Sequence, residues 1–99
     1  MINNNLVIDT FYQIATILKI ELDANVEITD SLNVDYRGRI FESQFGQIKK
    51  HSIEINKAVI KDEEELIEVI CHELAHIKQM RHCKSHTQLT NDYIKMVNK

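Results

Sequence analysis

The residues of this chain that could do chemistry are concentrated in the pattern H-E-x-x-H at residues 72–76. On a helix, His72 and His76 lie on one face, one turn apart, so both imidazoles can reach a single metal ion. Glu73 can face the same site without binding the metal and take a proton from metal-bound water. These three residues predict zinc-dependent hydrolysis of peptide bonds, with Zn²⁺ as the cofactor and Glu73 as the catalytic base.

A catalytic zinc ion needs three protein ligands and an open position for water. In a continuous helix His82 would point away from the histidine pair, so the chain must turn back after the helix. His82 stands in the expected turn and is the preferred third metal ligand. His86, where the next helix is expected to begin, is the alternative third ligand. His51 is interpreted as an ordinary surface histidine.

Hydrophobic periodicity predicts the elements that must position these residues. Asp62 and Glu65 have the spacing of a capping box, and an acidic first turn suits the positive end of a helix. This order predicts an α+β fold, with the three strands arranged as a hairpin or meander packed on helices. The expected elements are a helix over 5–22, strands over 23–31, 39–45 and 52–56, a helix from 62 to about 80, and a helix over 85–97.

Length and composition limit the class of protein. The chain has 99 residues, of which 43% are hydrophobic, enough for a single domain over 1–99 with a small core. Its formal net charge of −3 does not indicate binding to nucleic acid. No apolar run reaches the roughly 18 to 20 residues of a membrane span. No secretory signal is visible at the N-terminus, so we expect a cytoplasmic location, where Cys71 is a buried free thiol.

The arrangement H-E-L-x-H-x5-H, read from His72 to His82, resembles the SprT-like and WLM (YgjP-like) minimal zinc metallopeptidases of the zincin group. In these proteins a helix and a small sheet precede the H-E-x-x-H helix, and a third histidine follows within a short turn. The resemblance extends over nearly the whole chain. It implies zinc held by His72, His76 and His82, Glu73 as general base, and a peptide substrate lying along an edge strand. We expect that edge to be the strand with Ile53 and Ile55.

Two departures from related patterns bear on the third ligand. Metzincins share the spacing but carry a glycine in the turn, and residues 77–81 contain none. Relatives commonly have a small residue and then an aromatic residue after the third histidine, where this chain has Cys83 and His86.

The implied mechanism also needs a hydrogen-bond donor for the developing oxyanion. Tyr93, His86 and Arg81 are the candidates, although the spacing of Tyr93 places it in the core.

Three alternatives stay open at the level of sequence. Regulatory proteases with H-E-x-x-H usually use a carboxylate as third ligand, for which Asp92 is the only acidic residue after Glu73. Alternatively, the chain is a zinc-stabilised binding module with weak or lost peptidase activity. Its closed structural site would consist of His72, His76, His82 and His86. The presence of Glu73 favours the enzyme, because a purely structural zinc site does not need this residue. Because so small a domain has little surface for specificity, we also expect a partner protein that supplies it, besides a protein or peptide substrate.

Overall fold

The computed structural model describes residues 2–19, 24–33, 36–78 and 84–98. Its order of one helix, three strands and two further helices confirms the predicted α+β class. The elements are α1 (Asn4–Ile17), β1 (Ala24–Thr29), β2 (Gly38–Phe45), β3 (Ile48–Asn56), the short 3-10 helix η1 (Lys57–Val59), α2 (Glu63–Lys78) and α3 (Lys84–Val97).

The sheet has the strand order β1-β3-β2, so β3 is its central strand. β2 and β3 form an antiparallel hairpin, whereas β1 runs parallel to β3. The expectation of a hairpin or meander therefore holds only for β2 and β3. The expectation that the strand with Ile53 and Ile55 forms an edge is wrong, because this strand is β3 and both of its sides are paired. Alternating hydrophobicity reports which face of a strand is buried, not which strands lie beside it.

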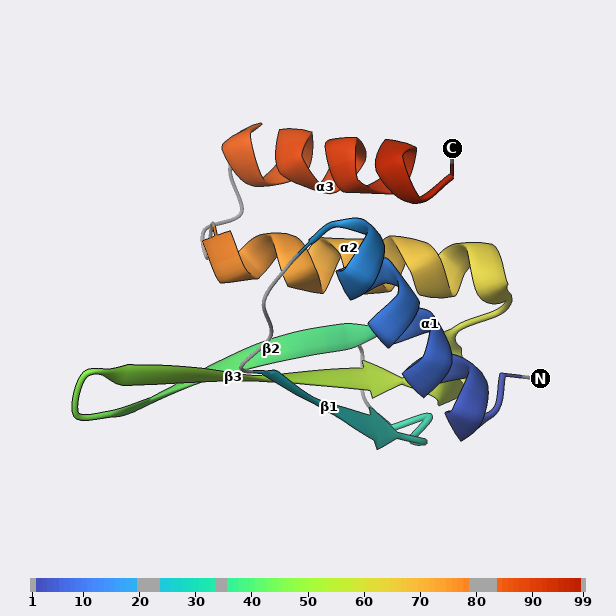
Figure 1. The fold of residues 1–99 in the computed structure, drawn as a ribbon. Helices are drawn as coiled ribbons and strands as arrows, with labels where there is room; N and C mark the ends of the chain where they lie inside the picture. The colour runs from blue at the N-terminus through green and yellow to red at the C-terminus, as the bar shows by residue number, and fades with distance from the viewer. Residues whose placement is uncertain (1, 20–23, 34–35, 79–83, 99) are drawn as a thin grey trace.

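All three helices lie on the same side of the sheet (Figure 1). α1 and α2 pack on the sheet, and α3 lies on the far side of α2. α2 is thus enclosed between the sheet and α3 and supplies the largest share of the core. None of the described helices combines the length and the apolar character that crossing a membrane requires.

The core lies between the sheet and the two helices that cover it. Ile53 and Ile55 of β3 are fully buried, as expected for alternate residues on the covered face of a central strand. Residues three and four apart on α1 and α2 meet them, which confirms the helical stripes predicted from the sequence. The fully buried or nearly buried members of these stripes are Val7, Phe11, Ile14, Leu66, Ile70 and Leu74.

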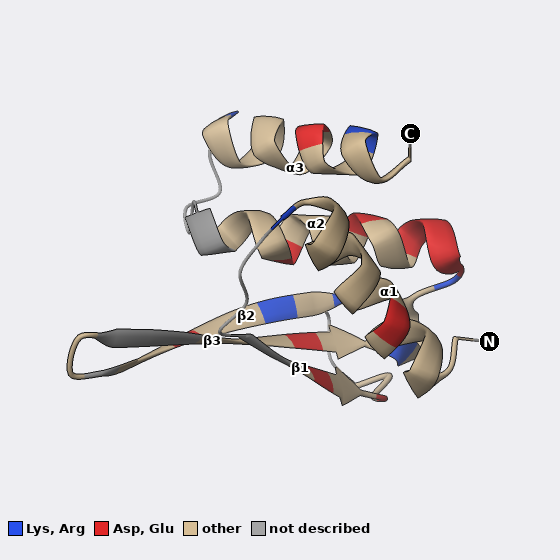
Figure 2. Cartoon of the chain, viewed as in Figure 1, with Lys and Arg blue, Asp and Glu red and all other residues tan. Residues whose placement is uncertain are grey.

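The starts of α1 and α2 are both capped by side chains. The Oδ1 atom of Asp62 accepts a hydrogen bond of 2.8 Å from the backbone N–H of Glu65, as the capping pattern predicted. Three glutamates follow in the first turn of α2, where the helix dipole favours negative charge (Figure 2). α1 is capped by Asn3, whose Oδ1 atom accepts a 2.8 Å hydrogen bond from the backbone N–H of Leu6.

The sheet face away from the helices carries a charged network centred on Glu54. This carboxylate accepts hydrogen bonds from the hydroxyl of Thr29, from the Nε atom of Arg39 at 2.5 Å and from the hydroxyl of Tyr36 at 3.1 Å. Glu54 is only 8% exposed, although Arg39 beside it is open to solvent. The bond from Thr29, followed by those from Arg39 and Tyr36, lowers the pKa of Glu54 against the effect of burial. The network therefore links β3 to β1 through Thr29, and to β2 and the segment before it through Arg39 and Tyr36.

The backbone of β2 lies close to α2 at Gly38. A Cβ atom at this position would lie 2.8 Å from Cγ1 of Val69 and 3.3 Å from Cγ of Glu73. Only glycine leaves room for both side chains, so Gly38 sets the distance between β2 and α2. Because Glu73 is one of the neighbours, this contact also positions a residue of the candidate catalytic set.

We expect Glu54→Gln to lower the free energy of unfolding by about 1–3 kcal/mol at neutral pH, because it removes the charge from buried hydrogen bonds. The pKa of Glu54 is lower in the folded than in the unfolded chain, so this stabilisation is present above the unfolded value and is lost as the pH falls through the folded one. Urea unfolding at pH 7 and at about pH 3 should therefore show a smaller deficit at acid pH. Glu27→Gln, at an exposed position of β1, is the matched control; an equal deficit for Glu54→Gln at both pH values would contradict the prediction.

We expect Gly38→Ala to destabilise the fold by about 1–3 kcal/mol, because the added methyl group overlaps Val69. In a double-mutant cycle with Val69→Ala, the cost of Gly38→Ala should fall, since the smaller side chain makes room. Thermal or urea unfolding of the four proteins measures this coupling. Gly46→Asn is the control, because Gly46 has φ of 63° with open space around it, and asparagine tolerates that conformation. Strict additivity between positions 38 and 69 would show that the overlap does not govern the contact.

Candidate metal centre and adjoining cleft

α2 brings the H-E-x-x-H residues to one face, as their spacing predicted. The rings of His72 and His76 lie edge to face, with their centroids 4.9 Å apart. His76 is 4% exposed, whereas the side chain of His72 is 40% exposed. The pair therefore has a buried member and a member that faces solvent.

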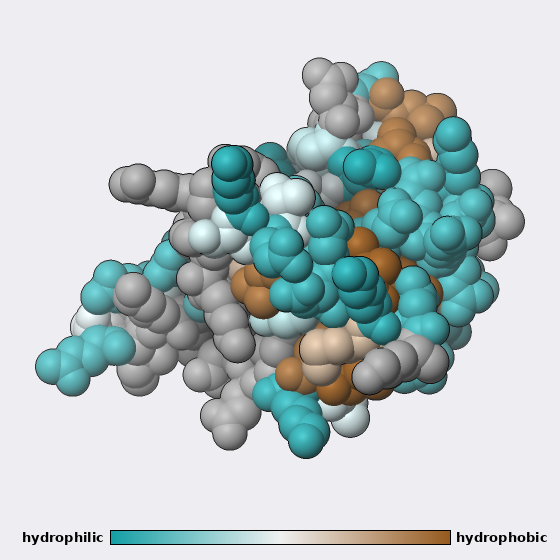
Figure 3. Space-filling view, turned by 90° about the horizontal axis from the view of Figure 1, so that it is seen from above, coloured by the Kyte–Doolittle hydropathy of each residue, from teal (hydrophilic) through white to brown (hydrophobic). Residues whose placement is uncertain are grey.

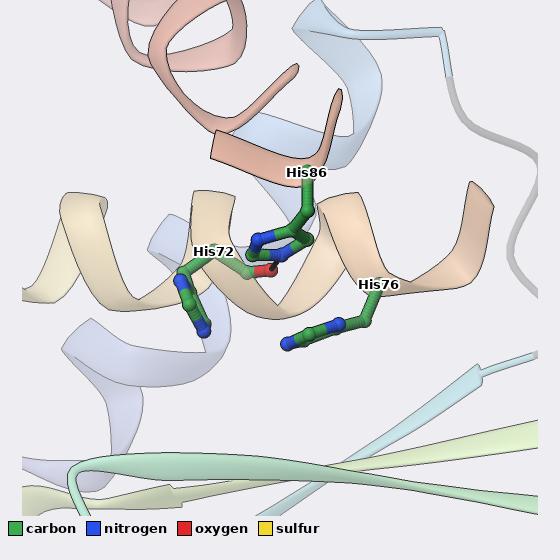
Figure 4. A group of neighbouring side chains, drawn as sticks. All are labelled: His72, His76 and His86. Carbon is green, nitrogen blue, oxygen red and sulfur yellow. Dashed lines mark hydrogen bonds between the residues drawn. The ribbon is translucent and has the colours of Figure 1, made fainter. Parts of the chain in front are cut away.

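α3 contributes a third imidazole to this group. The ring of His86 stacks on that of His76 with centroids 4.0 Å apart and lies 4.5 Å from that of His72 (Figure 4). One nitrogen from each of the three rings lies within 4.8 Å of the others. A metal ion held here would thus join the middle of α2 to the beginning of α3.

Backbone atoms of α2 help to place His86, which is only 2% exposed. Its Nε2 atom lies 3.1 Å from the carbonyl oxygen of His72, and a carbonyl oxygen can only accept. The Nε2–H of His86 therefore donates this bond, which orients the ring toward the group. Burial on the packed side of α3 and this hydrogen bond explain why a residue 14 positions after His72 joins it.

The structure describes one of the two residues weighed as third ligand. His86, the alternative, lies with the pair, whereas His82, the preferred residue, lies outside the described residues, as do Arg81 and Cys83. The choice of His82 thus stays a prediction. His51 lies on β3 and is absent from the histidine group found in the described part of the chain.

The three imidazoles fit a zinc ion in both donor type and arrangement. Zinc binds histidine nitrogen at about 2.0–2.1 Å, so tetrahedral ligands lie roughly 3.3 Å from one another. The separations of up to 4.8 Å are close enough for small side-chain rotations to reach that geometry. Two of the rings are buried and the third is partly open, so the accessible position faces the side of His72.

Glu73 lies beside this group with one carboxylate oxygen unused. Its Oε1 atom is 3.8 Å from Nε2 of His72, and its buried Oε2 atom makes no hydrogen bond among the described residues. Burial raises the pKa of Glu73 to about 7. A buried carboxyl without a structural partner is costly for the fold and is characteristic of groups that act on a ligand.

A cleft of about 510 Å³ opens next to His72 and Glu73. One wall is the segment that leads into β2, the floor is α2, and the other wall is the second half of α3. Apart from His72 and Glu73, the residues that line the cleft were not identified from the sequence. Two of them carried a signal: Gly38 is one of only two glycines, and Glu68 stands one helical turn before His72. The remaining lining residues are Tyr36, Arg37, Val69, Thr90, Asn91 and Ile94.

Other residues that the sequence offered lie away from the group. Tyr93 is 6% exposed in the core, as its spacing predicted, and burial raises its pKa. Burial also raises the pKa of Cys71 to about 12, which makes this free thiol a poor nucleophile. Asp92 is exposed on α3 and accepts a hydrogen bond from Gln88 at 2.9 Å, so the structure does not support it as a third ligand.

A family model matches most of the chain. The model of the SprT-like family matches residues 14–98, a range that begins inside α1 and includes the whole sheet, α2 and α3. No curated protein and no solved structure matches the chain significantly. The family match thus covers the histidine group, Glu73 and every residue that lines the cleft. The chain belongs to the SprT-like family.

Proposed function

We propose that this protein is a zinc-dependent metallopeptidase. His72, His76 and His86 bind the metal, and Glu73 is the general base. The observation that carries the proposal is the position of Glu73, whose unpartnered carboxylate oxygen lies beside three convergent histidines and lines a cleft. Membership of the SprT-like family supports it further.

The chain's own residues have distinct tasks in this reaction. Bound zinc would supply Lewis-acid chemistry, polarising the scissile carbonyl and making water a stronger acid. Glu73 accepts a proton from the attacking water and returns it to the leaving amine. Its burial suits this task, because a desolvated carboxylate is a stronger base than an exposed one. The buried rings of His76 and His86 exclude water from the far side of the site.

We place the peptide substrate in the cleft, alongside β2. β2 is an edge strand, and Gly38 at its start lines the cleft together with His72 and Glu73. An extended peptide can bind such an edge through backbone hydrogen bonds. β2 thus takes the role that the sequence analysis gave to the strand with Ile53 and Ile55.

A zinc-stabilised binding module remains the competing function. A closed site with four protein ligands would hold zinc without an open position for water, and it would not need Glu73. The cleft beside the exposed ring of His72 favours the enzyme, because substrate can approach from that side.

We expect about one zinc ion per chain in the purified wild-type protein. His72→Ala, His76→Ala and His86→Ala should each lose most of the zinc, because each removes a ligand. Zinc should also raise the melting temperature of the wild type but not of these variants. Elemental analysis and thermal unfolding measure both effects.

The matched control for metal content is His51→Ala, which should keep its zinc. His82→Ala tests the other candidate ligand in the same assay. Full zinc content in His86→Ala together with loss in His82→Ala would overturn the assignment of His86. Loss in both would favour the closed structural site.

We expect Glu73→Gln to keep zinc and to lower kcat for peptide hydrolysis by roughly 10²- to 10⁴-fold, the usual contribution of a general base. Glutamine preserves the size of the side chain but cannot accept the proton. Cleavage of an unstructured protein, followed together with metal content, measures both properties. Unchanged hydrolysis in Glu73→Gln would eliminate Glu73 as the base, and absence of hydrolysis in zinc-loaded wild type would favour the binding module.

A further inference from the structure

The cleft beside His72 contains two oppositely charged side chains from different elements. Glu68 comes from α2, where it stands one turn before His72 and therefore on the same face. Arg37 comes from the segment before β2. Either could recognise a charged side chain of a substrate, so their partners decide which charge is available.

Arg37 already has an acidic partner. Its Nη1 atom lies 3.5 Å from Oε1 of Glu65, a residue that is not among those lining the cleft. Glu68 is exposed, and its carboxylate makes no hydrogen bond or ion pair within the described ranges. The charge of Arg37 is therefore offset, while that of Glu68 is available to a ligand.

The cleft next to Glu68 combines polar and apolar surface, with polar surface in excess. Val69 and Ile94 line the cleft from α2 and α3, and the polar side chains of Thr90 and Asn91 flank them. Lysine and arginine match such a site, because their aliphatic stems cover apolar surface while the charged end reaches an acidic group. An acidic or purely apolar side chain would not pair with the carboxylate of Glu68, even where it covered the apolar surface of Val69 and Ile94.

The wider surroundings add to the negative potential. Three further glutamates occupy the first turn of α2, at the end of the helix nearer to Glu68 than to His76 (Figure 2). Because Glu65 pairs with Arg37, the added negative charge comes from Glu63 and Glu64. The face over α3 is largely hydrophilic, with apolar side chains in patches among polar ones (Figure 3). Charge is therefore the main source of discrimination at this end of the cleft.

We propose that Glu68 is a specificity-determining residue that selects substrates with a lysine or arginine side chain next to the scissile bond. This inference rests on the proposed peptidase function. Glu73 is buried at the same cleft, and its Oε2 atom has no hydrogen-bond partner among the described residues, which is an independent sign that a ligand binds here. The stem of the basic side chain lies on Val69 and Ile94, and its charged end pairs with Glu68.

The test uses fluorogenic peptides that are identical except at one position, which is lysine, leucine or glutamate, scanned across the residues around the cleaved bond. Zinc-loaded wild type should cleave the lysine peptide with a kcat/KM roughly two- to fivefold above that of the leucine peptide, as for a solvent-accessible ion pair. Glu68→Gln should abolish this preference, and Glu68→Lys should reverse it in favour of glutamate. Added salt should weaken the preference of the wild type.

Glu64→Gln is the matched control, because it removes the same charge from an exposed position of α2 outside the cleft. It should keep the lysine preference. Equal cleavage of all peptides by wild type, or a lysine preference that survives in Glu68→Gln, overturns the inference while leaving the peptidase function intact. A glutamate preference that Arg37→Gln removes would assign specificity to Arg37 instead.

Binding separates a failure of this inference from a failure of the proposed function. If wild type cleaves no peptide, the proposed catalysis fails, and fluorescence anisotropy of the same labelled peptides with zinc-loaded Glu73→Gln still tests the cleft. Tighter binding of the lysine peptide, lost in the Glu68→Gln/Glu73→Gln double variant, supports recognition by Glu68. Equal binding of all three peptides overturns it.

Discussion

The contact between α2 and β2 at Gly38 is the constraint on which the rest of the structure depends. The two backbones can come this close only because position 38 lacks a side chain. Val69, which occupies part of the space, belongs to the core and also lines the cleft, and Glu73 lines the cleft beside it. One contact therefore sets both the depth at which α2 is buried and the burial of the carboxyl beside the histidines.

One face of α2 packs in the core and another carries two residues of the candidate metal centre. α3 adds residues to both the core and the histidine group. Leu66, Ile70 and Leu74 point into the core, while His72 and His76 point toward the group that His86 joins. The hydrogen bond between His86 and the carbonyl of His72 couples this group to the backbone of α2. In so small a domain, the packing of two helices and the assembly of the site are thus one event.

Local signals in the sequence predicted much of the fold, and non-local arrangement accounts for the rest. The four-residue spacing of His72 and His76, the cap at Asp62 and the apolar stripes depend on neighbours along one helix, and the structure reproduces them. Strand order depends on contacts between distant segments, which alternation within a strand does not encode. The joining of His86 to the pair depends in the same way on how α3 docks on α2. The walls of the cleft come from three separate segments, so the sequence singled out His72 and Glu73 but gave only weak signals for Gly38 and Glu68 and none for the other lining residues.

The parallel pairing of β1 with β3 has a consequence for the order of folding. Ala24 of β1 pairs with His51 of β3, with the whole of β2 between them in the sequence, whereas β2 and β3 are joined by a tight turn at Gly46. Loop closure makes the local hairpin the faster event, so β1 adds to a strand whose other side is already occupied. The third imidazole arrives still later on the ribosome, because it lies on the last helix. The strands can therefore pair before the histidine group is complete, and a metal ion bound by that group would fix the docking of α3 on α2.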